Sequence, residues 1–125
     1  MNDKRAHFAR ILIVEDEPIL AMVLKQVIHQ AGFEIAGATG NLAKALYIVG
    51  SGICDAAVLD ANLAGVSAAP IADALAARGL PFLVLSGYSP EQQPAAFRAG
   101  RYLQKPAHPD QVIKLLNQIL SETQS

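Results

Sequence analysis

The amino-acid sequence predicts a single α/β domain in which helices cover both faces of a five-stranded parallel sheet. Short apolar runs alternate along the chain with segments of helical periodicity, as expected for strands joined by crossover helices. The runs are apolar at successive positions, which is typical of strands buried on both faces. At 125 residues, the chain has the length of one domain.

The expected strands are short and largely apolar. They cover residues 11–15, 34–38, 56–60, 81–86 and 101–104. The first helix is expected over residues 18–31, where apolar side chains recur at i, i+3, i+4, i+7 and i+11. Asp16 is its expected N-cap, Pro18 lies in its first turn, and Gly32 follows its end.

The remaining helices carry similar start and stop signals. Asn41 is expected to cap a helix that Gly50 ends, and Pro70 is expected to open one that Gly79 closes. The last helix is expected after Pro109. Its apolar face consists of Val112, Ile113, Leu116, Ile119 and Leu120.

The connection over residues 87–100 differs from the others. It contains Pro90 and Pro94 and has a glycine at each end. Proline removes a helical hydrogen bond and glycine weakens a helix, so any helix here is expected to be short.

The composition excludes several functional classes. Hydrophobic residues make up 52% of the chain and charged residues 17%, which excludes a disordered protein. A net charge of −1 gives no electrostatic basis for binding nucleic acid or an anionic membrane. The single cysteine, Cys54, has no partner for an internal disulfide, and no apolar run approaches the roughly 18 residues of a membrane helix. We therefore expect a cytoplasmic protein.

Polar residues follow four of the expected strands at the points where those strands end. Glu15 and Asp16 follow the first strand, and Asp60 ends the third. Ser86 ends the fourth, and Lys105 follows the fifth. Because ligands of open parallel sheets bind beyond the carboxyl ends of the strands, these side chains are expected to form one site.

These residue types point to phosphoryl chemistry that depends on a metal. Neighbouring carboxylates repel one another, and oxygen ligands of this kind suit Mg²⁺ rather than zinc. Lys105 adds a second positive charge. A metal, a lysine and a hydroxyl around a carboxylate can hold a phosphoryl group, and aspartates are known to form phosphorylated intermediates.

On these residues, the sequence resembles the receiver domain of bacterial two-component response regulators over residues 10–121. The resemblance implies that residues 1–9 and 122–125 are tails and that the sheet has the flavodoxin-like order 2-1-3-4-5. In the family, an acidic pair after the first strand binds Mg²⁺, and the aspartate that ends the third strand is phosphorylated. In this sequence the pair is Glu15 and Asp16, and the aspartate is Asp60.

The resemblance also implies roles for the neighbouring residues. Asp60 and the backbone carbonyl of Asn62 are expected to complete the Mg²⁺ ligands. Ser86 takes the place of the family's Thr or Ser, and Lys105 that of its phosphoryl-contacting lysine. The following Pro106 implies a cis peptide bond, which would turn Lys105 toward the site.

The resemblance extends to an aromatic residue near Lys105 and to the stretch at the fourth strand. Tyr102 occupies the position of the family's switch aromatic, and simple packing on the sheet is the alternative role for this ring. The stretch "PFLVLSGY" (81–88) is similar to the Pro-Phe-x-Phe-Ala-Thr-Gly-Tyr signature of a subgroup of single-domain receivers. Its first two and last two residues match, whereas residues 84–86 carry Val, Leu and Ser.

The resemblance implies a stand-alone receiver that accepts a phosphoryl group on Asp60 from a histidine kinase or a phosphotransfer protein. Its output would be the binding of a downstream protein or the return of the phosphate to a relay. Such a protein is not an enzyme beyond self-phosphorylation and autodephosphorylation, and a monomer or weak dimer is expected. Two alternatives are a docking module that acts without phosphorylation and a small phosphohydrolase that uses Asp60 as its nucleophile.

Overall fold

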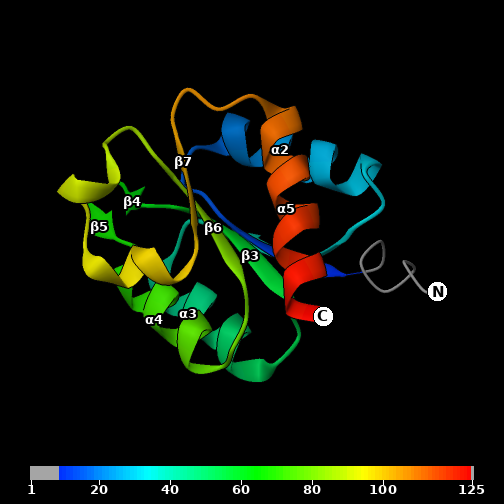
Figure 1. The fold of residues 1–125 in the computed structure, drawn as a ribbon, viewed down its shortest axis with the longest axis horizontal. Coiled ribbons are helices and arrows are strands. Elements are labelled where there is room, and N and C mark those ends of the chain that lie inside the picture. The colour runs from blue at the N-terminus through cyan, green and yellow to red at the C-terminus, as the bar shows by residue number, and fades with distance from the viewer. Residues whose placement is uncertain (1–8, 125) are drawn as a thin grey trace.

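A five-stranded parallel sheet with the order β2-β1-β3-β6-β7 forms the centre of the molecule (Figure 1). The computed structural model describes residues 9–124. Since β6 and β7 are the fourth and fifth sheet strands along the chain, this order confirms the predicted flavodoxin-like topology.

The element boundaries agree closely with the expected ones. The sheet strands are β1 (Arg10–Val14), β2 (Glu34–Thr39), β3 (Ala56–Asp60), β6 (Phe82–Ser86) and β7 (Arg101–Gln104). The α-helices are α2 (Pro18–Gln30), α3 (Leu42–Ser51), α4 (Ala69–Ala77) and α5 (Pro109–Gln124). Helix α5 therefore includes three of the four residues expected as a C-terminal tail, and residues 1–8 of the expected N-terminal tail lie outside the described residues.

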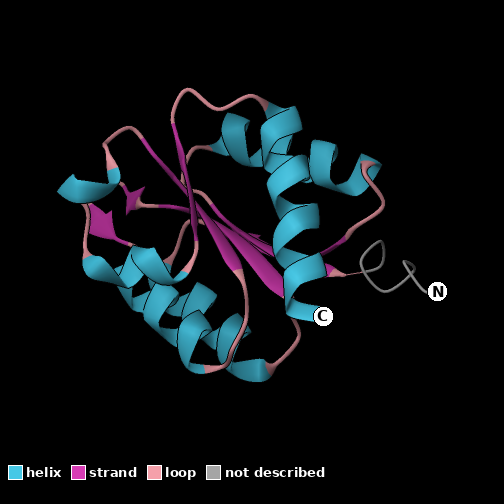
Figure 2. Cartoon of the chain, viewed as in Figure 1, coloured by secondary structure: helices cyan, strands magenta, loops and turns pink. Residues whose placement is uncertain are grey.

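Helices cover both faces of the sheet, with α2 and α5 on one face and α3 and α4 on the other (Figures 1 and 2). The apolar residues of β1 contribute to the core on both faces of the sheet. Ile11 and Ile13 join the core beneath α2 and α5, whereas Leu12 and Val14 join the core beneath α3 and α4. Successive side chains of a strand point to opposite faces, so a strand covered on both faces must be apolar throughout.

The start of α2 corrects one expectation. Its N-cap is Glu17 rather than Asp16, and no side-chain hydrogen bond caps the helix. Pro18 occupies the first turn, where its missing N–H costs nothing and its fixed φ suits the helix. The helix thus begins one residue later than an Asp16 cap would place it, and Asp16 belongs to the connection between β1 and α2.

Helix α3 begins as expected and ends later. The side chain of Asn41 accepts a hydrogen bond from the Lys44 N–H at 2.8 Å, which confirms the predicted cap. Gly50 lies within the helix, and the C-cap is Gly52, whose φ of 77° is the left-handed conformation that favours glycine. The prediction that Gly50 ends this helix was therefore wrong.

The connection between β6 and β7 contains two short 3-10 helices, η1 (Pro90–Gln92) and η2 (Ala95–Ala99), as its prolines predicted. Phe97 is buried and fixes η2 against the core beneath α3 and α4. An unpredicted hairpin of β4 (Asn62–Leu63) and β5 (Val66–Ser67) follows β3. Across residues 9–124, every helix is too short or too polar to cross a membrane.

Candidate functional site

The carboxyl edge of the sheet brings together the polar residues singled out in the sequence. Glu15 and Asp16 directly follow β1, and Asp60 is the last residue of β3. Ser86 ends β6, and Lys105 directly follows β7. Strand β3 pairs with both β1 and β6, and β6 pairs with β7, so these four strand ends lie side by side.

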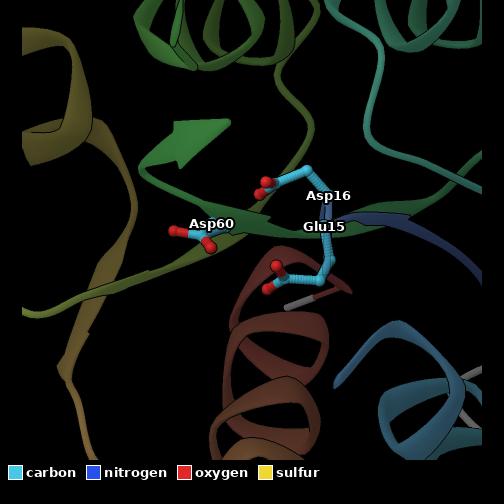
Figure 3. A group of neighbouring side chains, drawn as sticks. All are labelled: Glu15, Asp16 and Asp60. Carbon is cyan, nitrogen blue, oxygen red and sulfur yellow. The ribbon is translucent and has the colours of Figure 1, made fainter. Parts of the chain in front are cut away.

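The three acidic residues form one cluster (Figure 3). One carboxylate oxygen of each residue lies within 4.8 Å of those of the other two. Figure 3 shows the carboxylates of Glu15 and Asp16 converging on that of Asp60 from the end of β1. Glu15 is 3% exposed and Asp60 8% exposed, whereas Asp16 is half-buried.

Burial makes the Glu15 carboxylate costly to ionise. The pKa of Glu15 is raised from 4.5 to about 7, mainly by burial and further by the nearby negative charge of Asp60. One oxygen, Oε2, accepts the Glu17 backbone N–H at 3.0 Å, which acts in the opposite direction. The other oxygen, Oε1, is buried and has no hydrogen-bond partner among the described residues.

Both oxygens of the Asp60 carboxylate contact a donor. The Lys105 ammonium lies 3.1 Å from Oδ2, and the Asn62 backbone N–H donates to Oδ1 at 3.2 Å. The Lys105 side chain is 32% exposed, so this ion pair is only partly screened by solvent. The Lys105–Pro106 peptide bond is cis, and the Lys105 N–H donates to the Ser86 carbonyl at 2.6 Å.

The Ser86 hydroxyl and the Tyr102 ring both hold the loop that follows β6. The hydroxyl oxygen of Ser86, a buried residue, accepts the Tyr88 N–H at 3.1 Å. The Tyr102 hydroxyl donates to the Tyr88 carbonyl at 2.8 Å, and its ring packs partly buried against the core beneath α3 and α4. Tyr102 therefore contacts the loop and not the acidic cluster.

The donor set fits a hard divalent cation. Clustered carboxylate oxygens without nitrogen or sulfur ligands suit Mg²⁺, and the unpartnered Glu15 Oε1 offers one such oxygen. Glu15, Asp16 and Asp60 are the residues able to hold the ion. The Asn62 N–H, rather than its carbonyl, is the group that contacts Asp60, so the carbonyl as a metal ligand stays a prediction.

Sequence reasoning missed the turn between β2 and α3. The Thr39 carbonyl accepts the Glu15 N–H at 3.0 Å, and the next residue, Gly40, packs directly against Asp16. This turn is far from the acidic pair in sequence. Because β2 lies beside β1 in the predicted strand order, that order could have placed this turn next to the acidic pair.

The sequence of this chain is similar to those of known signalling proteins. A family model described as "Response regulator receiver domain" matches residues 11–117. The virulence factors putative positive transcription regulator BvgA of Bordetella pertussis is 31% identical over 85 residues, which make up 66% of this chain and 41% of BvgA. The chain therefore spans less than half the length of the curated relatives that it matches.

Solved structures show the same fold. SdrG from Sphingomonas melonis Fr1 is 41% identical with a TM-score of 0.76, and the match covers 91% of this chain and 98% of SdrG. The receiver domain of the PhyR response regulator from Erythrobacter litoralis is 26% identical with a TM-score of 0.80 and covers 94% of both chains. A CheY-like receiver protein from Methanospirillum hungatei JF-1 has a TM-score of 0.83 at 22% identity, which supports the fold alone.

Proposed function

The chain belongs to the family of response regulator receiver domains, and from this premise we propose that Asp60 accepts a phosphoryl group from the phosphohistidine of a histidine kinase or a phosphotransfer protein. The observation that carries the proposal is the environment of Asp60. Its carboxylate lies at the carboxyl edge of the sheet between the Lys105 ammonium and the acidic pair of Glu15 and Asp16.

In the proposed transfer, an oxygen of the Asp60 carboxylate forms a bond to phosphorus. The phosphorus–nitrogen bond of the phosphohistidine breaks, and the imidazole leaves with the electron pair of that bond. Phosphoryl transfer depends mainly on positioning and on neutralising negative charge. Lys105, which already contacts Asp60 at 3.1 Å, is placed to pair with the oxygens of the incoming group.

We assign the Mg²⁺ ligands to Glu15, Asp16, Asp60 and the Asn62 carbonyl. When bound, the ion supplies positive charge that offsets the clustered carboxylates and the phosphoryl oxygens. The raised pKa of Glu15 and its unpartnered oxygen support this assignment, because both describe a buried carboxylate that lacks a positive partner. Asp60 would then serve as both phosphoacceptor and ligand.

The contacts of Ser86 suggest how the signal leaves the site. A phosphoryl oxygen on Asp60 would attract the Ser86 hydroxyl as a donor, because hydrogen bonds to charged oxygens are stronger than neutral ones. The hydroxyl now accepts the Tyr88 N–H, so its rotation toward Asp60 would release that N–H. The segment over residues 87–100 would then rearrange, since its two 3-10 helices contain few buried side chains.

Hydrogen exchange with and without beryllofluoride, a phosphoryl mimic, tests this switch. We expect protection to rise over residues 87–100 and near Lys105, and to stay unchanged in α2. Without the mimic, Tyr102→Phe should speed exchange over residues 88–93, because the Tyr88 carbonyl loses its hydrogen bond, whereas Tyr47→Phe on the exposed surface of α3 should not. If Tyr102→Phe leaves the mimic's effect intact, the hydrogen bond from the Tyr102 hydroxyl to the Tyr88 carbonyl is not required for the switch. Uniform protection, or none over 87–100, would contradict the switch.

We further propose that the protein acts as a stand-alone receiver, close to the subgroup with the Pro-Phe-x-Phe-Ala-Thr-Gly-Tyr signature. Pro81, Phe82, Gly87 and Tyr88 match that signature, and nearly the whole of SdrG aligns with this chain. Output would then depend on binding a downstream protein or returning the phosphate to a relay.

The direct test of the function is phosphorylation by a small acyl phosphate such as acetyl phosphate. We expect the intact mass to rise by one phosphoryl group with Mg²⁺ present and to stay unchanged with a chelator. A chain that binds Mg²⁺ but never gains the group would instead be a docking module that acts without phosphorylation.

A further inference from the structure

Gly40 makes an unusually close contact with the acidic pair. It lies in the turn between β2 and α3, where the space for a side chain is taken by Asp16. A Cβ atom at this position would lie 2.6 Å from the Asp16 Cα, 2.9 Å from the Asp16 Cβ and 3.1 Å from the Glu15 carbonyl oxygen. Real Cβ atoms essentially never approach other atoms within 3.0 Å, so any side chain here must displace one of the two segments.

The turn that carries Gly40 is held on both sides. Before it, the Thr39 carbonyl accepts the Glu15 N–H at 3.0 Å, and the Thr39 hydroxyl accepts the Asn41 N–H at 3.1 Å. After it, the Asn41 side chain caps α3 through the Lys44 N–H. Moving the turn away from Asp16 would break a sheet contact or a helix cap, and either loss would destabilise the fold.

Asp16 is held less firmly than the turn. Across residues 9–124, no hydrogen bond anchors its carboxylate, which points toward Asp60 (Figure 3). Asp16 sits between the end of β1 and the Glu17 cap of α2, so its position depends on the backbone packing at this junction. A side chain at position 40 is therefore expected to displace Asp16 rather than the turn.

We propose that Gly40 is a positioning residue: by bringing the turn against Asp16, it sets the Asp16 carboxylate at the distance from Glu15 and Asp60 that a divalent cation requires. This inference rests on the Mg²⁺ site of the proposed function. Mg²⁺ demands near-ideal octahedral geometry with oxygens at about 2.0–2.1 Å, so even a small displacement of one carboxylate weakens binding. Residues that orient metal ligands typically contribute roughly ten- to hundredfold in affinity.

Calorimetric titration with MgCl₂ tests the proposal on Gly40→Ala. We expect Mg²⁺ affinity to fall by roughly ten- to hundredfold. The matched control is Gly37→Ala in the preceding strand β2, where the added Cβ meets the flexible end of the Ile48 side chain at 2.8 Å. Its Mg²⁺ affinity should stay within about twofold of wild type. Affinity in Gly40→Ala equal to that in Gly37→Ala would overturn the proposal.

A second variant separates positioning from general destabilisation. An added Cβ at Gly50, inside α3, meets nothing within 4 Å, and alanine favours a helix over glycine. Gly40→Ala in the Gly50→Ala background should therefore melt closer to wild type and still bind Mg²⁺ weakly. Affinity that recovers together with the melting temperature would show that Gly40 affects only folding, and would overturn the proposal.

A double-mutant cycle tests whether Gly40 acts through Asp16. In an Asp16→Asn background, Gly40→Ala should cause little further loss of Mg²⁺ affinity. If Gly40→Ala lowers Mg²⁺ affinity by the same factor in the wild-type and Asp16→Asn backgrounds, Gly40 does not act through Asp16. These measurements use Mg²⁺ alone and do not depend on phosphorylation. If the variants differ in Mg²⁺ affinity as expected but the wild-type protein never becomes phosphorylated, the proposed function is contradicted and the role of Gly40 is not.

Discussion

Replacing Glu15 by Gln is expected to raise the melting temperature of the metal-free protein by on the order of 10 °C at pH 8 and by much less at pH 5. In the folded chain the pKa of Glu15 is raised to about 7 from 4.5, so folding favours the protonated carboxyl. The unfolded chain loses this proton first as the pH rises, and stability therefore falls between about pH 4.5 and pH 7.

The size of this effect follows from the pKa difference. A shift from 4.5 to about 7 corresponds to about 3 kcal/mol at pH 8. Gln keeps an oxygen for the Glu17 N–H but carries no charge, so it avoids this cost. Glu17→Gln is the matched control, because that side chain is exposed and caps nothing.

Thermal melts of the two variants and wild type, at pH 5 and pH 8 in the presence of a chelator, measure the effect. Excess Mg²⁺ should then narrow or reverse the gap at pH 8, because it stabilises only the protein that retains its ligand. Equal melting temperatures for wild type and Glu15→Gln at pH 8 would show that the buried Glu15 carboxylate does not destabilise the folded protein, which would contradict this prediction.

Asp16→Asn is expected to lower Mg²⁺ affinity by about a hundredfold or more. The substitution removes one negative charge and one carboxylate from the cluster, whereas loss of a residue that merely orients a ligand costs ten- to hundredfold. Glu17→Gln removes the same charge one residue further along the chain and should change affinity little, since Glu17 lies outside the cluster. Titration calorimetry with MgCl₂ compares the two. Unchanged affinity in Asp16→Asn would remove Asp16 from the metal site.

The parts of the fold that depend on local sequence were predictable. Apolar runs located the strands, and the parallel topology then placed Asp60 and Lys105 at one edge because strand ends of a parallel sheet meet there. The cap at Asn41 was also predictable, because it needs only an acceptor side chain three residues before a free N–H.

The parts that depend on tertiary contacts were not predictable. The sequence predicted Asp16 as the cap of α2, and only the structure shows that Glu17 occupies the cap while Asp16 belongs to the acidic cluster. The pKa of Glu15 depends on burial by several elements, and the contact of Gly40 with Asp16 joins residues from two different loops. Neither leaves a periodic pattern in the chain.

The measurement that tests the central claim most directly is the intact mass of wild type and Asp60→Asn after incubation with acetyl phosphate and Mg²⁺. Asp73→Asn, an exposed aspartate on α4, is the matched control. The account predicts one added phosphoryl group on wild type and on Asp73→Asn, and none on Asp60→Asn. Equal phosphorylation of Asp60→Asn and wild type would show that another residue accepts the group and would contradict the account.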